Sequence, residues 1–466
     1  MRSAICGAIG LALLTGACAG PSVETARVAP VVAPPDWRVD LGPGAPIDAQ
    51  WWQGFGDPQL AALVEEALAR NADIAIAGAR VREARAQQAL ARSALLPTLD
   101  AAVSGADSRS VNPFGMAVEQ RAAQPQLQAA WELDLFGRLS DQVSAARSAW
   151  LASQAARDAA RLTVAASTAN AYITLLALDD RLAAAERTSA IRKGSRDLIA
   201  RRVALGYSPK LELQQAEVDY QSALLLVPAV EQARARQENA LSVLTGKVPG
   251  AVARAAGLAA LMRPPVPASL PSELLRRRPD VAQAEYQLAA SDSNLAAARK
   301  RFLPQVRLSA SAGAAFSSLL SGPIGLWSVG GSVLAPIFEG GRLRAGAETA
   351  GAQRDAAAFA YRKAALNAFR EVNDALAAVD GLDRQVVIQT RQRDALAEAN
   401  RLATNRYREG YSPLLEQLDT QRGLLTSELS LIQARADALN ARVALYQALG
   451  GGWVQGEMDG ATREGL

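Results

Sequence analysis

The chain contains no histidine and only two cysteines among its 466 residues. These absences remove the most common general base, the usual zinc ligands and any Cys/His nucleophilic pair. Asp and Glu are plentiful, but they occur singly on expected helix faces, where a solvated surface explains them better than paired acid and base catalysis. The sequence therefore predicts no enzyme, no bound metal and no cofactor.

Aromatic residues and net charge are also scarce. Phe, Trp and Tyr make up 5% of the chain, whereas Ala is abundant, which favours close helix packing over a bulky globular core. Lys and Arg (50) nearly balance Asp and Glu (46), so the net charge is +4, with the two signs interspersed. Because nucleic-acid binding needs a concentrated basic surface, we expect no nucleic-acid partner.

Long apolar runs are confined to the N-terminus. Arg2 precedes an apolar run over residues 5–14, which is the layout of a secretory signal. Cys18 follows small residues and resembles the lipidated cysteine of bacterial lipoproteins, although Thr15 stands where those signals usually have leucine; cleavage after Ala19 is the alternative. No other run of about 18 apolar residues exists, so we expect no transmembrane helix. If the mature chain spans a membrane, strands must do it.

A repeat organises the rest of the chain. Gly206-Tyr207-Ser208-Pro209 recurs as Gly410-Tyr411-Ser412-Pro413, an offset of 204 residues. The same offset matches Arg138-Leu139 to Arg342-Leu343, Leu241 to Leu445 and Gly246 to Gly450. A unit of about 200 residues is far longer than the repeats of solenoid proteins, so the sequence predicts two copies of one large supersecondary unit.

Each copy contains a stretch of alternating apolar and polar residues, which predicts strands with one apolar and one polar face. In the first copy the alternation covers residues 98–104 and 126–135, with an expected loop over 105–120. In the second copy it covers residues 305–316 and 326–338, with a turn at Gly322-Pro323. Strands of about ten residues can cross a bilayer when tilted. A soluble β-sandwich is the alternative.

Two long segments without proline, residues 139–205 and 343–409, predict unbroken helices. Each precedes the Gly-Tyr-Ser-Pro motif, in which glycine suits the residue after a helix, serine can cap the next helix and proline can begin it. The sequence thus predicts two antiparallel helical hairpins. Pro228 lies inside the first return helix, where the second copy has Ile432, and predicts a kink.

The expected domain layout follows from these patterns. It assigns residues 1–17 to a signal peptide, 18–56 to an extended N-terminal arm, 57–246 to the first repeat, 247–279 to a proline-rich linker, 280–453 to the second repeat and 454–466 to a C-terminal tail. Four amphipathic strands cannot close a barrel, and lipid does not tolerate open sheet edges. Several chains must therefore join, and a trimer would supply twelve strands and twelve helices around an aqueous tube.

Five ordered motifs are shared with a known family. They are Trp51-Trp52 with Asp57-Pro58, the string WELDLFGR over residues 131–138, Arg406-Tyr407 with Gly410, Leu418-Asp419 with Gln421-Arg422, and ALGGGW over residues 448–453. With these motifs the chain resembles the TolC-like outer-membrane efflux channels, specifically the lipoprotein branch of NodT and OprM type. The similarity covers nearly the whole mature chain, and the string 131–138 is its most specific part.

The resemblance implies a mainly α-helical, internally duplicated chain with four strands, closed as a homotrimer. Its twelve-stranded β-barrel would lie in the lipid of a Gram-negative outer membrane, anchored by lipid at Cys18, and its helices would form an α-barrel across the periplasm. The implied function is a passive exit duct for solutes. Its partners would be a periplasmic adaptor (membrane fusion) protein and an inner-membrane pump, usually proton-driven.

The resemblance also implies a periplasmic gate. Leu415 would form an apolar ring and Asp419 an acidic ring that narrow the mouth, while Arg406, Tyr407 and Arg422 would tie the inner hairpin closed. In the first copy the counterparts of Asp419, Arg422 and Tyr407 are Gln215, Val218 and Val203. Only the second hairpin carries the polar cluster, which suits an iris-like opening. Alternatively, Asp419 and Arg406 merely suit the helix dipoles near their positions.

The two repeated tips are expected adaptor contacts, through Gly206, Tyr207, Ser208, Gly410, Tyr411 and Ser412. Turn geometry alone would also explain the motif. Two other functions compete with the channel. A secreted coiled-coil structural or adhesive surface protein would be water-soluble and would not need the alternating strands, and a periplasmic carboxylate enzyme would need a pocket with paired acids, of which the sequence gives no sign.

Overall fold

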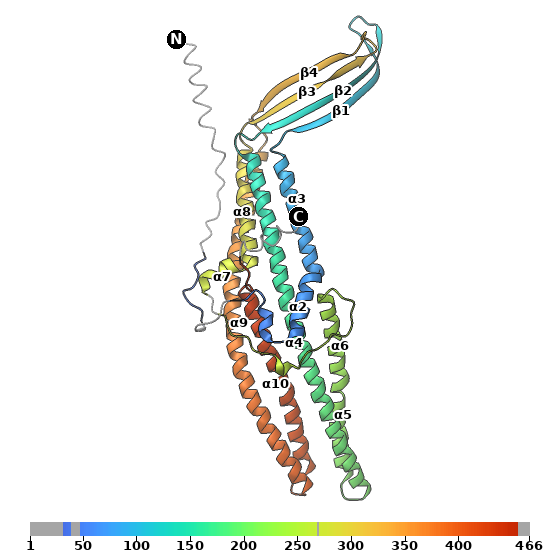
Figure 1. Ribbon diagram of the computed structural model, residues 1–466, viewed down its shortest axis with the longest axis vertical. Helices are drawn as coiled ribbons and strands as arrows, with labels where there is room; N and C mark the ends of the chain where they lie inside the picture. Colours follow the sequence, from blue (N-terminus) through green and yellow to red (C-terminus); the bar gives the residue numbers. More distant parts are fainter. Residues whose placement is uncertain (1–30, 39–46, 268–269, 455–466) are drawn as a thin grey trace. The chain divides into compact units, whose positions relative to one another are not determined.

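The computed structural model describes residues 31–38, 47–267 and 270–454 (Figure 1). The expected signal peptide and Cys18 lie outside the described residues, as does the expected tail beyond residue 454. The helices are α2 (Pro58–Arg70), α3 (Ala72–Ser93), α4 (Arg138–Ala204), α5 (Lys210–Leu224), α6 (Leu226–Leu244), α7 (Pro271–Arg277), α8 (Pro279–Lys300), α9 (Arg342–Arg408) and α10 (Leu414–Ala448), with 3-10 turns η1 (Trp51–Phe55) and η2 (Leu258–Ala260). The strands are β1 (Thr98–Val111), β2 (Ala117–Leu133), β3 (Gln305–Ser317) and β4 (Ile324–Leu334).

The chain divides into two compact units, and each draws on both repeats. The sheet unit contains residues 79–154 and 283–363, and the hairpin unit contains residues 31–78, 155–282 and 364–454 of the described chain. The helices α4 and α9 begin in the sheet unit and end in the hairpin unit. Each of these two helices has 67 residues, so the predicted unbroken helices are confirmed.

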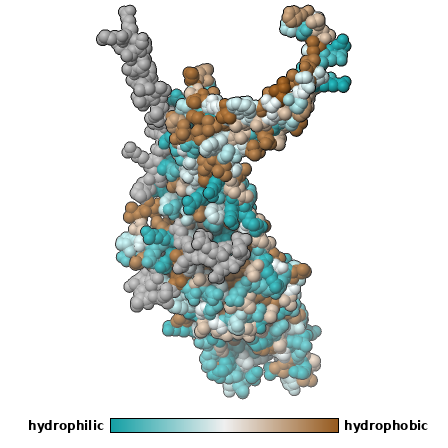
Figure 2. Space-filling view, turned by 45° about the horizontal axis from the view of Figure 1, so that its top comes forward, coloured by the Kyte–Doolittle hydropathy of each residue, from teal (hydrophilic) through white to brown (hydrophobic). Residues whose placement is uncertain are grey.

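The sheet has the antiparallel order β1-β2-β3-β4, and its register separates apolar from polar rows. One row across the four strands contains Ala101, Leu127, Ala312 and Trp327. The neighbouring row, on the opposite face, contains Asp100, Gln128, Ser311 and Ser328. Hydrophobic residues gather on the sheet, whereas the hairpin tips are mostly hydrophilic (Figure 2). One apolar and one polar face is the pattern of a membrane β-barrel wall.

The expected loop over residues 105–120 is wrong. Strand β1 continues to Val111 and β2 begins at Ala117, so only five residues form the turn. The extra length is polar, because cross-strand ion pairs join Arg121 to Asp107 (3.1 Å) and Arg109 to Glu119 (3.7 Å). Exposed ion pairs contribute little, so the backbone ladder carries this part of the hairpin, and its mostly polar side chains hid the strands from the hydrophobic pattern. The last expected strand is also too long, since β4 ends at Leu334 instead of residue 338.

The string 131–138 makes the joint between β2 and α4. Trp131 donates its indole N–H to the carbonyl of Leu95 (3.0 Å), and Arg138 forms an ion pair with Glu132 (2.5 Å). Asp134 caps α4 by accepting the backbone N–H groups of residues 139 and 140 at 2.9 and 2.8 Å. Gly137 between them has a φ of 74°, which favours glycine. The motif therefore fixes where the strand ends and the long helix begins.

The two hairpin tips differ from expectation in one respect. Gly206 and Gly410 have φ values of 80° and 79°, as predicted for the residue after a helix. The following helices, however, begin after Pro209 and Pro413, and neither helix has a side-chain cap. The expected serine caps are wrong because proline itself occupies the capping position, one residue closer to the helix than serine.

The kink predicted at Pro228 is confirmed as a break. Helix α5 ends at Leu224 and α6 begins at Leu226, whereas the equivalent α10 is continuous over 35 residues. Proline has no N–H to donate to the carbonyl four residues earlier, and its ring clashes with that carbonyl. That residue is Leu224, the last residue of α5.

An aromatic core holds the hairpin unit together. Asp57 caps α2 as predicted, accepting the N–H groups of Gln59 (2.7 Å) and Leu60 (3.1 Å). The hydroxyl of Tyr172 on α4 donates to the same carboxylate (3.2 Å), and burial raises the pKa of Tyr172 to about 12. Trp51 stacks on Tyr446 of α10 with ring centroids 5.5 Å apart. The core thus ties η1 and α2 to both hairpins.

Within the described residues, α4 is the one helix that is long and apolar enough to cross a membrane. More than half of its most apolar stretch is buried against the rest of the chain. Burial of this extent is typical of a core helix, which passes the same test of length and composition.

Candidate functional site

The candidate site lies in the hairpin unit and centres on Asp219 of α5, whose carboxylate is only 2% exposed. Arg192 of α4 forms an ion pair with one carboxylate oxygen (Nε to Oδ2, 3.0 Å) and donates from Nη1 to the Asp219 carbonyl (2.9 Å). Arg422 of α10 donates from Nε to the other oxygen (2.7 Å). One buried carboxylate of the first hairpin is therefore shared with an arginine of the second.

The repeat shows that the fold does not require this buried charge. At the offset of 204 residues, Arg192 corresponds to Leu396 and Asp219 to Gly423. In the second hairpin these two positions pack directly, since a Cβ on Gly423 would lie 3.3 Å from the Leu396 side chain. Buried ion pairs can often be replaced by apolar residues without loss of stability. What Asp219 adds to the first hairpin is a binding partner for Arg422.

Tyr407 makes a second contact between the hairpins. It packs against a buried cluster of residues from both of them, Ile199, Ala216, Leu414 and Leu418. The guanidinium of Arg202 lies over the Tyr407 ring, 5.6 Å from its centroid, which is a cation–π distance. Burial raises the pKa of Tyr407, and the charge of Glu212 adds to the increase. Tyr407 therefore stays neutral at physiological pH.

The remaining predicted gate residues stay on the second hairpin. Arg406 forms an ion pair with Glu416 (3.2 Å) across the tip of its own hairpin. Leu415 and Asp419 are exposed and lie one helical turn apart on α10. The structure thus brings Arg422 and Tyr407 against the first hairpin, and it places Arg406, Leu415 and Asp419 elsewhere.

Sequence reasoning missed Arg192 and Asp219. Neither stands out by type, because arginine and aspartate are common on helix surfaces. The available signal was the repeat itself, which aligns this charged pair with Leu396 and Gly423. Two opposite charges replaced by apolar and small residues at equivalent positions indicate a buried pair instead of a solvated face.

The two tips have the same backbone geometry. In each turn the tyrosine N–H donates to the carbonyl five residues earlier, with Tyr207 to Arg202 and Tyr411 to Arg406 both at 2.8 Å. The tyrosine side chains are 80% and 78% exposed. Ser208 is half-buried and Ser412 is buried, so the tyrosines are the large side chains that the tips offer to a partner.

Comparison with known proteins defines the class. The family model described as outer membrane efflux protein matches residues 63–247 and 270–451, one range in each half of the chain. The chain therefore belongs to this family, which consists of channels and not of enzymes.

Relatives and solved structures agree with that class. The chain is 36% identical to outer membrane protein OprJ of Pseudomonas aeruginosa, with 96% of each chain covered. It is 34% identical to the pyoverdine export outer membrane protein OpmQ of the same organism, with 98% of each covered. Among solved structures, the outer-membrane channel OprN has a TM-score of 0.85 at 30% identity and covers 93% of this chain and 99% of its own. The open state of the MtrE channel of Neisseria gonorrhoeae has a TM-score of 0.82 at 31% identity, covering 93% and 98%.

The predicted function is thereby confirmed. The protein is the outer-membrane channel component of a tripartite efflux system of a Gram-negative bacterium, and it works with an adaptor and an inner-membrane pump. Its long helices and four strands per chain close as a trimeric twelve-stranded barrel. The comparisons do not support the alternative of a secreted adhesive protein.

Proposed function

We propose that the second hairpin closes the periplasmic end of the duct and that Arg422 and Tyr407 hold it against the first hairpin. The observation that carries the proposal is the buried carboxylate of Asp219, shared between Arg192 and Arg422 at 3.0 and 2.7 Å. Opening separates Arg422 and Tyr407 from the first hairpin while each hairpin keeps its own packing. The channel itself performs no chemistry and needs no cofactor.

The arrangement makes opening inexpensive. The Arg422 side chain is 48% exposed, so solvent screens its bond and rehydrates the guanidinium when the bond breaks. Leaving a buried carboxylate without any partner would cost about 3–5 kcal/mol. Arg192 prevents that cost because it stays paired with Asp219 in both states. The link is therefore a reversible tie.

Leu415 and Asp419 act in the trimer. Both are exposed on α10 and lie one turn apart, so three copies around a common axis form an apolar ring and an acidic ring. The three carboxylates of the acidic ring repel one another and favour separation once the ties are released. Arg406, paired with Glu416, stiffens the tip that carries these residues.

The tips are the proposed adaptor contacts. Both present an exposed tyrosine beside a left-handed glycine, through Gly206, Tyr207 and Ser208 and through Gly410, Tyr411 and Ser412. Exposed tyrosines are frequent anchors of protein interfaces. The double variant Y207A/Y411A is expected to bind the cognate adaptor more weakly than either single variant. Equal binding by all three variants and the parent would exclude the tips as contacts.

Two further features complete the proposal. Cys18 carries the lipid anchor, which intact mass spectrometry of the mature protein tests directly. The inner-membrane pump is proton-driven, so an uncoupler that collapses the proton gradient is expected to stop export. Export that continues without the gradient would contradict this step.

Single-channel recording tests the gate. The double variant D419A/R422A removes the acidic ring and the tie, and it is expected to raise conductance in planar bilayers severalfold over the parent. A conductance equal to that of the parent would remove both residues from the gate.

A further inference from the structure

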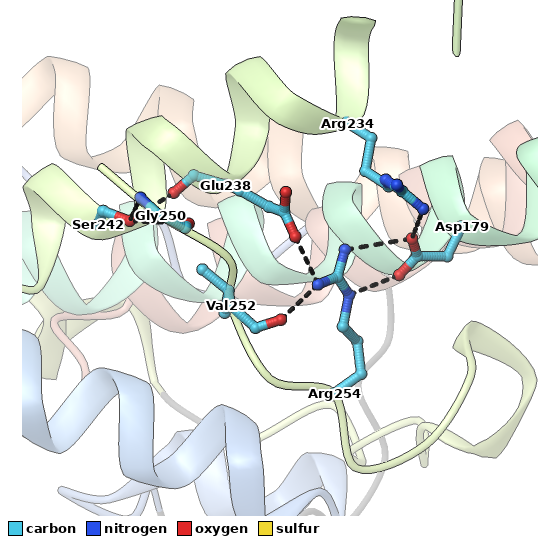
Figure 3. A network of polar contacts seen from close by, with 7 residues as sticks. All are labelled: Asp179, Arg234, Glu238, Ser242, Gly250, Val252 and Arg254. Atoms are coloured by element: carbon cyan, nitrogen blue, oxygen red, sulfur yellow. Dashed lines mark hydrogen bonds and ion pairs between the residues drawn. The ribbon is translucent and has the colours of Figure 1, made fainter. Parts of the chain in front are cut away.

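The linker between the two repeats inserts one arginine between two carboxylates of the first hairpin (Figure 3). Arg254 contacts both oxygens of Asp179 on α4, from Nε to Oδ2 at 2.8 Å and from Nη2 to Oδ1 at 3.2 Å. Its Nη1 also donates to Glu238 on α6 (2.6 Å) and to the linker carbonyl of Val252. A single guanidinium therefore joins α4, α6 and its own linker.

In the second repeat the equivalent aspartate is paired with an arginine of its own hairpin. At the offset of 204 residues, Asp179 corresponds to Asp383 and Glu238 to Arg442. Arg442 of α10 bonds both oxygens of Asp383 on α9 directly, at 2.6 and 3.1 Å. It also donates to the linker carbonyl of Pro264 (3.3 Å). Each hairpin thus has one arginine that pairs with the equivalent aspartate and holds a linker carbonyl.

The two arginines come from different places in the chain. In the second repeat the cation belongs to the helix, whereas in the first repeat the helix offers Glu238 instead and the linker supplies the cation. Without Arg254, two carboxylates would face each other at this level. The nearest other cation is Arg234 of α6, whose Nη1 lies 3.9 Å from Asp179 and which is more exposed than Arg254.

We propose that Arg254 is a positioning residue that replaces the arginine missing from the first repeat and thereby clamps the linker onto the first hairpin. The inference concerns the linker and does not depend on the gate. Close beside the clamp, the backbone N–H of Ala255 donates to the buried hydroxyl of Tyr172 (3.4 Å), and the linker side chains Leu258 and Leu261 join the core of the hairpin unit.

The electrostatics agree with this geometry. Burial lowers the pKa of Arg254, but its bonds with Asp179 and Glu238 outweigh burial and raise the pKa above its usual value. The planar guanidinium satisfies two carboxylates and a carbonyl at once, which a lysine ammonium cannot match in geometry. Arg254→Lys is therefore expected to hold the linker less well than the parent although the charge is kept.

Exchanging the charges tests the proposal. R254E places three carboxylates together, so it should release the linker. E238R copies the second repeat, where Arg442 and the linker's Arg263 both lie beside Asp383, so on its own it should release the linker less than R254E does. The double variant E238R/R254E again puts one cation between two carboxylates and should restore the clamp. Thermolysin cleaves before large apolar residues, and Leu258 and Leu261 are buried in the clamped linker. Cleavage at these positions by thermolysin, measured on the intact trimer, reports the release.

The expected outcome is an increase in linker cleavage of roughly tenfold in R254E, because cleavage follows the population of the open form. The double variant should return to within about threefold of the parent, as expected for directly coupled residues. The matched control is R263A in the same linker. Arg263 also reaches an aspartate, Asp383 (3.4 Å), but that carboxylate is already held by Arg442, so cleavage should stay at the parent rate.

Two results would overturn the proposal. The first is cleavage of E238R/R254E as fast as that of R254E, which would show that Arg254 acts through packing or bulk charge and not through the pair. The second is parent-like cleavage in R254E, which would show that the core residues alone hold the linker. Neither result bears on the gate, because the readout does not require the channel to open.

Discussion

The two hairpins have the same backbone plan but different internal chemistry. In both, the helix that precedes the tip has 67 residues, and the turn after it begins with a left-handed glycine. The ends of the two return helices, opposite the tips, also make equivalent contacts. Asn71 donates to the carbonyl of Leu244 (3.0 Å) in the first copy, and Arg278 donates to the equivalent carbonyl of Ala448 (3.0 Å) in the second.

The differences concentrate where one hairpin must bind something other than itself. The first hairpin has the buried pair Arg192 and Asp219 where the second has Leu396 and Gly423. It also depends on the linker for the cation that the second hairpin carries on its own helix. The duplication thus supplies an internal control. Where the two copies share a backbone conformation but differ in residue type, the differing residue is a candidate for function.

Substitutions where the two return helices end, opposite the hairpin tips, are expected to give the largest effect. They test whether the backbone plan shared by the two hairpins is essential. Gly246 and Gly450 both have positive φ, and an added Cβ would lie 2.7 Å from the carbonyl oxygen of Arg70 and 1.8 Å from that of Arg277. Alanine at either position should cost more than about 2 kcal/mol, from the left-handed backbone and the clash together. Thermal unfolding of the trimer should show a larger loss for G450A than for G246A.

The matched control for this pair is Gly381, a helical glycine of α9 whose added Cβ would meet no atom within 4 Å apart from its chain neighbours and its own helix backbone. G381A should raise stability by about 0.5–1 kcal/mol, because alanine is the better helix former. An equal loss of stability in G246A, G450A and G381A would show that glycine has no special role after the two return helices.

Replacing the buried ion pair of the first hairpin by the residues of the second is expected to affect transport more than stability. In R192L/D219G the tie loses its carboxylate, so open events should become severalfold more frequent in planar bilayers. Stability should change by less than about 2 kcal/mol, including the cost of a helical glycine. R192L alone should be less stable than the double variant, because it leaves the buried Asp219 with Arg422 as its remaining arginine. Parent-like gating in the double variant would separate the buried pair from the gate.

The smallest expected effect comes from Asp180 of α4, whose counterpart Arg384 is exposed and pairs with Asp380 (2.6 Å). Burial raises the pKa of Asp180, although Arg435 opposes the shift. A carboxyl with a raised pKa in the folded state contributes stability at low pH, and this contribution is lost as the pH rises through the folded pKa.

At pH 7 the ionised Asp180 is therefore unfavourable. D180N should stabilise the trimer at that pH by less than about 1 kcal/mol, since solvent screens a partly exposed group. The gain should vanish below the unfolded pKa of about 3.9. Chemical unfolding at several pH values measures it, and a gain that is the same at every pH would assign the effect to packing instead of charge.

The sequence was sufficient for the architecture because its strongest signals are local or repeated. Proline-free helices, a duplicated turn motif and alternating strands each leave a pattern along the chain. The strands beyond residue 104 were missed because their side chains are mostly polar, and the backbone register that pairs Asp107 with Arg121 is not visible in one strand. The serine caps were wrong because a one-residue shift changes which side chain caps the helix.

The site was predicted only in part, for the same physical reason. Arg422 and Tyr407 lie in a motif, whereas their partners are fixed by how two helices pack, with Asp219 more than 200 positions away from Arg422. Packing of that kind becomes visible in a sequence only when a second copy offers a contrast. The role of Arg254 likewise becomes apparent only by comparison with Arg442 in the second repeat.

The central claim is that Arg422 ties the second hairpin to the first, and single-channel conductance of R422A tests it most directly. The matched control is R401A on α9, since Arg401 is an exposed arginine that pairs with Glu398 of its own helix (2.6 Å). R422A is predicted to conduct severalfold more than the parent, while R401A conducts as the parent does. The same conductance in R422A, R401A and the parent would contradict the account.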